Sequence, residues 1–189
     1  PDINKKDIIL IKGRDNKYGG DPIGRASHIM SALDLISPAI KETKIRIFQA
    51  SDNIKKTAHK LQNKYGLDIK ILDYIDYGKL LNYFFRAKIF ISITIADGLP
   101  STLIESMTFG AFPIYSNLEP IREWVQDGIN GFLIEQNNIE KLSESILMAN
   151  NNNVLLERAM EINHTLVKTK LNDKLIRDSI NNIYLNLTK

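Results

Sequence analysis

The sequence contains no cysteine among its 189 residues. This excludes disulfide bonds and metal sites built from thiolates, and it favours a cytoplasmic protein. No apolar run approaches the ~20 residues of a membrane-spanning helix. The first apolar run, residues 8–11, is also far too short for a signal peptide. The composition is that of an ordinary soluble protein, and the length suffices for one sizeable α/β domain.

Charge is unevenly distributed along the chain. Residues 1–96 carry 17 Lys and Arg against 10 Asp and Glu, whereas residues 97–189 carry 8 against 12. The basic first half suits an anionic ligand or an anionic membrane surface. Its cations are scattered and lack the interleaved aromatic residues of an RNA-binding sheet, so nucleic acid is not an expected partner.

Short apolar runs alternate with segments of helical periodicity. Strands are predicted over residues 8–12, 45–50, 69–72, 89–95, 111–115 and 131–134. Helices are predicted over residues 26–36, 52–65, 77–88, 100–109, 121–125, 139–149 and 154–187, the last in two pieces that meet near residues 170–173. The alternation predicts a Rossmann-like three-layer α/β sandwich with a parallel sheet of about six strands.

Three residues mark expected boundaries of these elements. Asp52 is a candidate cap for the helix over residues 52–65, and Gly66 is its expected stop. Pro113 lies inside the fifth predicted strand, which suggests that this strand is irregular or lies at an edge.

Residues 97–105 join a buried strand to a helix and form the most informative segment. They read Asp-Gly-Leu-Pro-Ser-Thr-Leu-Ile-Glu, so two carboxylates, Asp97 and Glu105, bracket a Gly/Pro turn. Open α/β sheets bind ligands outside the carboxyl ends of their strands, and a helix start offers free N–H groups to a phosphate. An acid on each side of a phosphate site suggests a ligand with phosphates in the middle and hydroxyls at both ends, such as a nucleotide-sugar.

The same residues also have a purely structural interpretation. The segment from Thr102 to Glu105 fits a capping box, in which Thr102 caps the helix and Glu105 folds back to a backbone N–H. Pro100 argues against this, because proline favours the first helical position and would move the cap to Leu99. Spacing alone does not decide between a helix cap and a ligand site.

Residues 89–134 resemble the nucleotide-sugar-binding half of retaining glycosyltransferases of the GT-B class, family 4 (group 1). That family carries two acids separated by seven residues, usually both Glu, and here Asp97 and Glu105 stand at this spacing. Residues 106–114 look like the helix end, glycine stop and next strand of the family, and residues 124–134 look like its "dG-x-x-Gf-l-i" segment. The resemblance implies that residues 1–189 are a single donor-binding domain, the C-terminal half of a GT-B fold, with C-terminal helices over about 154–187.

The resemblance also implies roles for individual residues. Asp97 would contact hydroxyls of the donor sugar near the anomeric carbon, and Glu105 would accept hydrogen bonds from the ribose. Arg14 would neutralise the diphosphate together with Lys17 or Arg25, and Arg25 is favoured because it lies where the loop meets the helix. Further donor contacts are expected at the helix start, from Gly98 and from the backbone near Ser101, Thr102 and Leu103. The base would lie near residues 73–76.

The resemblance implies a hexosyltransferase that transfers a sugar with retention from a UDP-, GDP- or ADP-sugar to a glycan or lipid acceptor, without a metal. The chain starts at Pro1, so we expect the N-terminal acceptor domain to be absent and the isolated domain to be inactive alone. The full-length protein is expected in the cytoplasm, in peripheral contact with the membrane. Two alternatives stay open: an epimerase or phosphorylase of the GT-B class, and a non-catalytic Rossmann-like module, which the Asp at position 97 would fit.

Overall fold

The structure of the chain is a computed structural model, which describes residues 2–15, 17, 18 and 21–172, without the side chains of residues 17, 18, 21 and 22. One sheet contains β1 (Ile8–Lys12), β4 (Lys44–Phe48), β5 (Ile69–Leu72), β6 (Ala87–Ser92), β7 (Phe112–Ser116) and β8 (Phe132–Ile134). The loop after β1 contains a short antiparallel hairpin of β2 (Lys17–Tyr18) and β3 (Asp21–Pro22). The helices are α1 (Ala26–Ile36), α2 (Asp52–Tyr65), α3 (Tyr77–Arg86), α4 (Ser101–Thr108), α5 (Glu119–Arg122), α6 (Ile139–Asn150) and α7 (Asn153–Lys170), and two 3-10 helices span Ile3–Lys5 and Ser37–Ala39.

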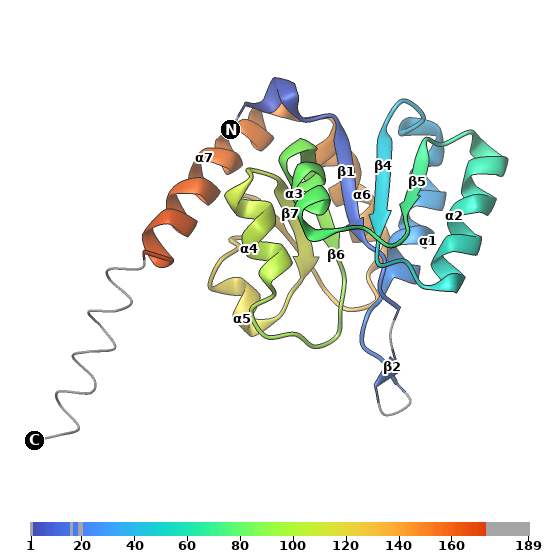
Figure 1. Cartoon of the computed structure of the whole chain (residues 1–189), viewed down its shortest axis with the longest axis horizontal. Coiled ribbons are helices and arrows are strands. Elements are labelled where there is room, and N and C mark those ends of the chain that lie inside the picture. Colours follow the sequence, from blue (N-terminus) through green and yellow to red (C-terminus); the bar gives the residue numbers. More distant parts are fainter. Residues whose placement is uncertain (1, 16, 19–20, 173–189) are drawn as a thin grey trace, which may run out of the picture.

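The main sheet is parallel throughout, with the strand order β5-β4-β1-β6-β7-β8. This confirms the predicted α/β sandwich with six parallel strands. The chain moves outward from β1 to β5 and then returns to the other side of β1 with β6, so strand order reverses between β1 and β6. Such a switch point is where open α/β sheets bind ligands. The carboxyl ends of the strands face the lower edge of Figure 1, where the β2 hairpin projects.

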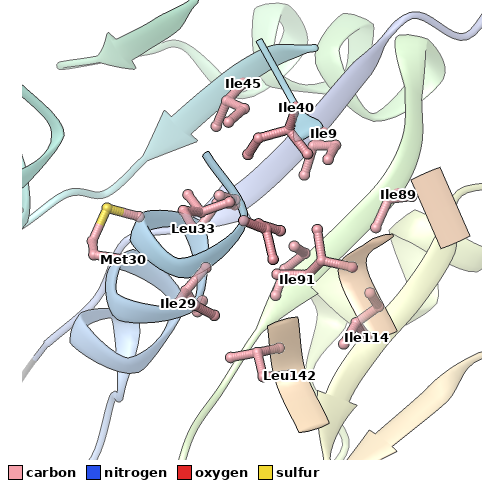
Figure 2. Close-up of a cluster of buried hydrophobic side chains, with 14 of the residues drawn as sticks. Ile9, Ile29, Met30, Leu33, Ile40, Ile45, Ile89, Ile91, Ile114 and Leu142 are labelled. Atoms are coloured by element: carbon pink, nitrogen blue, oxygen red, sulfur yellow. The ribbon is translucent and has the colours of Figure 1, made fainter. Parts of the chain in front are cut away.

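Helices bury both faces of the sheet. Ile9 and Ile11 of β1 pack under α1, α2 and α6, whereas Ile8 and Leu10 pack under α3, α4 and α5. Isoleucines from β1, β4, β6 and β7 face α1 and α6 in the first of these layers (Figure 2). A strand buried on both faces needs an uninterrupted apolar run, which explains why the sequence shows runs rather than alternation.

Pairing within the sheet moves two of the predicted boundaries. The helix predicted over residues 77–88 ends at Arg86, because Ala87 already pairs with Ile8 of β1. The strand predicted over residues 89–95 therefore runs over Ala87–Ser92. Residues 93–95 leave the sheet because their backbone forms hydrogen bonds with the loop that precedes α1. Arg25 N–H, for example, donates to Ile93 O at 2.9 Å.

Three further predictions concern single residues. Pro113 does not mark an edge, because β7 pairs with both β6 and β8; pairing with β8 begins only at Ile114. Ser51 rather than Asp52 caps α2, since its hydroxyl accepts from Ile54 N–H at 3.4 Å. Gly66 ends α2 as predicted, with a left-handed φ of 72°.

A buried lysine ties the start of the chain to the sheet. The ammonium of Lys6 donates to the carbonyl oxygens of Phe85, Ala87 and Phe109 at 3.0, 3.0 and 2.7 Å. Burial lowers the pKa of Lys6 to about 8, so the side chain is still mostly protonated at neutral pH. The three carbonyls lie at the α3–β6 junction and at the end of α4, so one side chain fixes both.

A buried pair of asparagines joins α7 to the loop before β8. Asn130 Nδ2 donates to Trp124 O at 2.9 Å and to Asn163 Oδ1 at 2.8 Å, and Asn163 Nδ2 donates back to Asn130 O at 2.9 Å. Both side chains are buried. The second half of the predicted C-terminal helix, residues 173–187, lies outside the described residues. Within the described part of the chain, no helix is long and apolar enough to cross a membrane.

Candidate functional site

A cavity of about 220 Å³ opens at the carboxyl ends of β1 and β6. Lys12 and Arg14 line it from the end of β1, Ser92, Thr94 and Asp97 from the end of β6, and Gly24 from the loop before α1. A complete small-molecule site usually measures ~300–1,000 Å³. The cavity therefore suits one part of a larger ligand, and it lies at the switch point that the topology singles out.

The loop before α1 is held tightly against the end of β6. Ile95 N–H donates to Ile23 O at 2.9 Å, and the hydroxyl of Thr94 lies 3.0 Å from the same oxygen. At Gly24 a Cβ atom would lie 2.2 Å from the carbonyl oxygen of Arg14. Only glycine permits this approach, which fixes the backbone of Arg14 at the wall of the cavity.

The acid pair predicted from the sequence sits on the turn after β6 and on α4. Asp97 is exposed and lines the cavity, and its Oδ2 accepts from the hydroxyl of Tyr115 at 3.4 Å. Burial raises the pKa of Tyr115, so this hydroxyl keeps its proton and remains a donor. Glu105 is half-buried on α4, and its Oε1 accepts from the hydroxyl of Tyr77 at 2.9 Å. Each acid is thus held by a tyrosine from a neighbouring element.

Neither structural interpretation of the helix start is correct. Pro100 occupies the capping position itself and makes no side-chain cap, so α4 begins at Ser101, and neither Thr102 nor Leu99 is the cap. Glu105 bonds to Tyr77 instead of folding back onto the backbone.

Two of the three N–H groups expected at this helix start remain available. The N–H of Leu103 already donates to Pro100 O at 3.0 Å, because the helix starts early enough to include it in the first turn. Among the described residues, no hydrogen bond satisfies the N–H groups of Ser101 and Thr102. Gly98 is exposed, and a Cβ there would meet no atom within 4 Å, so the space beside the turn is open.

The structure brings Arg14 to the cavity but does not do the same for Arg25. Arg25 is half-buried at the start of α1. Burial and, next, the charge of Arg25 lower the pKa of His28, so the guanidinium lies within electrostatic reach of His28. Arg25 is not among the residues that line the cavity. Lys17 belongs to β2, and its side chain lies outside the described part of the structure.

Three residues of this region were not predicted from the sequence: Lys12, Tyr77 and Tyr115. Lys12 is half-buried, and burial lowers its pKa, whereas the charges of Asp97 and Glu105 raise it. The available signal was a lysine at the end of an otherwise apolar strand, five residues long. The two tyrosines carry no comparable signal, because only the packing of α3 and β7 beside the acids gives them their partners.

Comparisons with known proteins place the fold in a known group. Over 122 residues the chain is 29% identical to a poly(glycerol-phosphate) alpha-glucosyltransferase of Bacillus subtilis (strain 168). The matched segment makes up 64% of this chain but only 18% of that protein. The structure of an S. aureus TarM mutant with Fondaparinux, alpha-GlcNAc-glycerol and UDP is similar with a TM-score of 0.76 at 20% identity, over 97% of the chain and 35% of TarM. The C-terminal domain of a glycosyl transferase group 1 family protein (LpcC) from Francisella tularensis is similar with a TM-score of 0.72 at 19% identity, over 88% of both chains.

The chain thus spans a minor part of the longer relatives but nearly all of a single C-terminal domain. The parallel six-stranded sheet with its flanking helices agrees with these likenesses. The family model for glycosyl transferases group 1 matches residues 4–167. Because this match covers most of the chain, the protein belongs to the glycosyl transferases group 1 family.

Proposed function

We propose that the chain is the donor-binding domain of a glycosyltransferase that moves a sugar from a nucleotide-sugar to a glycan or lipid acceptor. The observation that carries this proposal is the cavity between β1 and β6, which joins Arg14 to Asp97 beside the α4 start. Arginine can bind a diphosphate through two parallel hydrogen bonds, and a helix start favours an anion. The TarM structure contains UDP, which makes a UDP-sugar the first donor to test.

The proposed donor runs from the Tyr77 side of α4 to the cavity. Its ribose lies at Glu105 and its diphosphate lies between Arg14 and the free N–H groups of Ser101 and Thr102. The transferred sugar lies at Asp97. A carboxylate has about four sites that accept hydrogen bonds. Each acid can therefore keep its tyrosine partner while it binds sugar hydroxyls.

In the proposed reaction, the bond from the anomeric carbon to the diphosphate breaks, and the electron pair leaves with the nucleoside diphosphate. The acceptor hydroxyl oxygen forms the new bond to that carbon, and its proton passes to the departing diphosphate. We propose that the anomeric configuration is retained and that protein cations, rather than a metal, neutralise the leaving group. Charge-assisted hydrogen bonds to developing charge are usually the largest contribution to such catalysis.

The acceptor side of the reaction is proposed to belong to the rest of the enzyme. The Bacillus subtilis glucosyltransferase and TarM are much longer than the segments they share with this chain, which supports a further domain. We propose that this domain binds the glycan or lipid acceptor and that the full-length protein works at the inner face of the membrane. The basic balance of residues 1–96 supports an anionic surface as a neighbour.

Thermal unfolding with a panel of UDP-, GDP- and ADP-sugars tests the donor site. A ligand at ten times its dissociation constant should add about 1.4 kcal/mol to the free energy of unfolding. We expect this for one nucleotide family, with a strongly reduced effect in Glu105→Ala and an unchanged effect in Glu140→Ala, an exposed acid in the first turn of α6. A folded protein that responds to no donor would contradict the proposal.

Product analysis with the full-length enzyme tests the reaction class. We expect transfer of the sugar to an acceptor, and NMR of the product should show the anomeric configuration of the donor. Epimerisation of the donor, or cleavage by inorganic phosphate without transfer, would instead assign the donor site to one of the other GT-B activities.

A further inference from the structure

Lys12 is a cation that lines the cavity and has no direct partner among the described residues. It is the last residue of β1, it is half-buried, and it lines the cavity together with Arg14 and Asp97. Within the described residues, its ammonium makes no hydrogen bond and no ion pair within 4.0 Å. A charge that is partly removed from water without a partner destabilises the folded protein. A ligand that brings negative charge into the cavity beside Arg14 would supply the missing partner.

The position of Lys12 on the strand sets the direction of its side chain. Leu10, two residues earlier, packs in the layer under α3 and α4, and side chains two apart share a face of a strand. Lys12 therefore extends over the α4 side of the sheet edge. Both Asp97 and Glu105 stabilise its charge from a distance, whereas Arg14 opposes it. The ammonium thus lies in the field of both acids and of the arginine.

We infer that Lys12 is the second cation that binds the donor diphosphate, together with Arg14. This inference rests on the proposed donor site, in which the diphosphate lies between the region of Asp97 and the region of Glu105. Lys12 lies within the electrostatic reach of both acids and also lines the cavity. Arg25, by contrast, is not among the residues that line the cavity. In this assignment, the two cations come from the end of β1 and lie two residues apart in the sequence.

Substitution of Lys12 by methionine separates binding from stability. Loss of one hydrogen bond to a charged group corresponds to roughly 10- to 100-fold in affinity. We expect Lys12→Met to weaken binding of UDP by this factor, to leave binding of the uridine nucleoside within twofold, and to leave the ligand-free melting temperature equal or higher. A residue that only supports the fold would instead lower the melting temperature.

Lys88→Met is the matched control for this experiment. Lys88 is also a half-buried lysine on a strand, and burial also lowers its pKa, but it lies near the opposite end of the sheet. Lys88→Met should leave UDP binding unchanged. Lys12→Arg should retain most of the UDP affinity, because it keeps the charge, and it also serves if the methionine variant fails to fold.

The outcomes distinguish this inference from the donor proposal on which it rests. If the unmodified domain binds no nucleoside diphosphate, the donor proposal fails. If it binds UDP and Lys12→Met binds UDP equally well, only the assignment of Lys12 fails. Equal losses for uridine and UDP would show that Lys12 positions the acids rather than the diphosphate, and this would also overturn the assignment.

Discussion

Replacement of Gly24 by alanine should disrupt the wall of the cavity. A Cβ atom at this position would lie 2.2 Å from the carbonyl oxygen of Arg14 and 2.8 Å from its carbonyl carbon. Ordinary contacts of this kind are longer by about 1 Å, so either the loop or the Arg14 peptide must move. Both neighbours are backbone atoms, and the loop is bonded to the end of β6 by Ile95 N–H and Arg25 N–H. The movement therefore costs hydrogen bonds as well as packing.

The expected loss of stability is substantial for a domain of this size. Overpacking of a well-ordered site costs ~1–3 kcal/mol, and each strained or broken hydrogen bond adds about 1 kcal/mol. Against this, alanine recovers roughly 0.4–1 kcal/mol by restricting the unfolded chain. We expect Gly24→Ala to lower the free energy of unfolding by about 3 kcal/mol, out of a typical total of ~5–15 kcal/mol.

Gly98→Ala is the control for this prediction. Gly98 lies in the neighbouring turn, and a Cβ there would meet nothing within 4 Å. The free energy of unfolding of the Gly98→Ala variant should stay within about 0.5 kcal/mol of that of the unsubstituted domain. Urea unfolding monitored by circular dichroism measures both variants, with equal m-values expected. If the two alanine variants unfold at the same urea concentration, the close approach of Gly24 to Arg14 does not hold the loop, and the reasoning is wrong.

Three further predictions concern stability away from the cavity. Lys6→Met should cost about 2–3 kcal/mol in urea unfolding, because three carbonyl oxygens lose a charged donor, whereas exposed Lys5→Met should change little. Asn163→Ala should cost about 3 kcal/mol by the same measurement, since it leaves buried groups of Asn130 unpaired. Hydrogen bonds from arginine and lysine lower the pKa of Asp7 from 3.8 to about 2, so its contribution is present above pH 3.8 and lost as the pH falls to 2. Because Asp7 is partly exposed, Asp7→Asn should remove less than about 1 kcal/mol of acid-dependent stability in unfolding curves at pH 2–5.

Most of the sheet could be predicted because its central strands β1, β6 and β7 are buried on both faces. The runs at residues 8–12 and 69–72 became strands with the expected bounds. The boundaries that differ are those that depend on a partner distant in the sequence. Ala87 joins the sheet through Ile8, and Pro113 lies between two strands although its own chemistry favours an edge. Local propensity does not contain this information.

The site shows the same division between local and distant information. Arg14 and Asp97 could be placed at one cavity from the order of elements alone, because both follow strands that flank the switch point. The hydroxyl partners of the acids could not, since they come from α3 and from the end of β7. Lys12 was overlooked because a lysine at a strand end is usually solvated. Only the folded structure shows that it lines the cavity beside Arg14 and Asp97.

The two tyrosines give the acid pair a geometry that differs from that of two free carboxylates. The side chain of Asp97 is one methylene shorter than that of the Glu usual at this position of the family. Tyr115 nevertheless holds Asp97 through a hydrogen bond from the end of β7. Because Tyr115 is buried and protonated, it orients Asp97 without adding charge to the cavity. Tyr77, which is exposed, donates its hydroxyl to Glu105 from α3. In the proposed donor site, both acids are therefore oriented before the ligand arrives, and less conformational freedom is lost on binding.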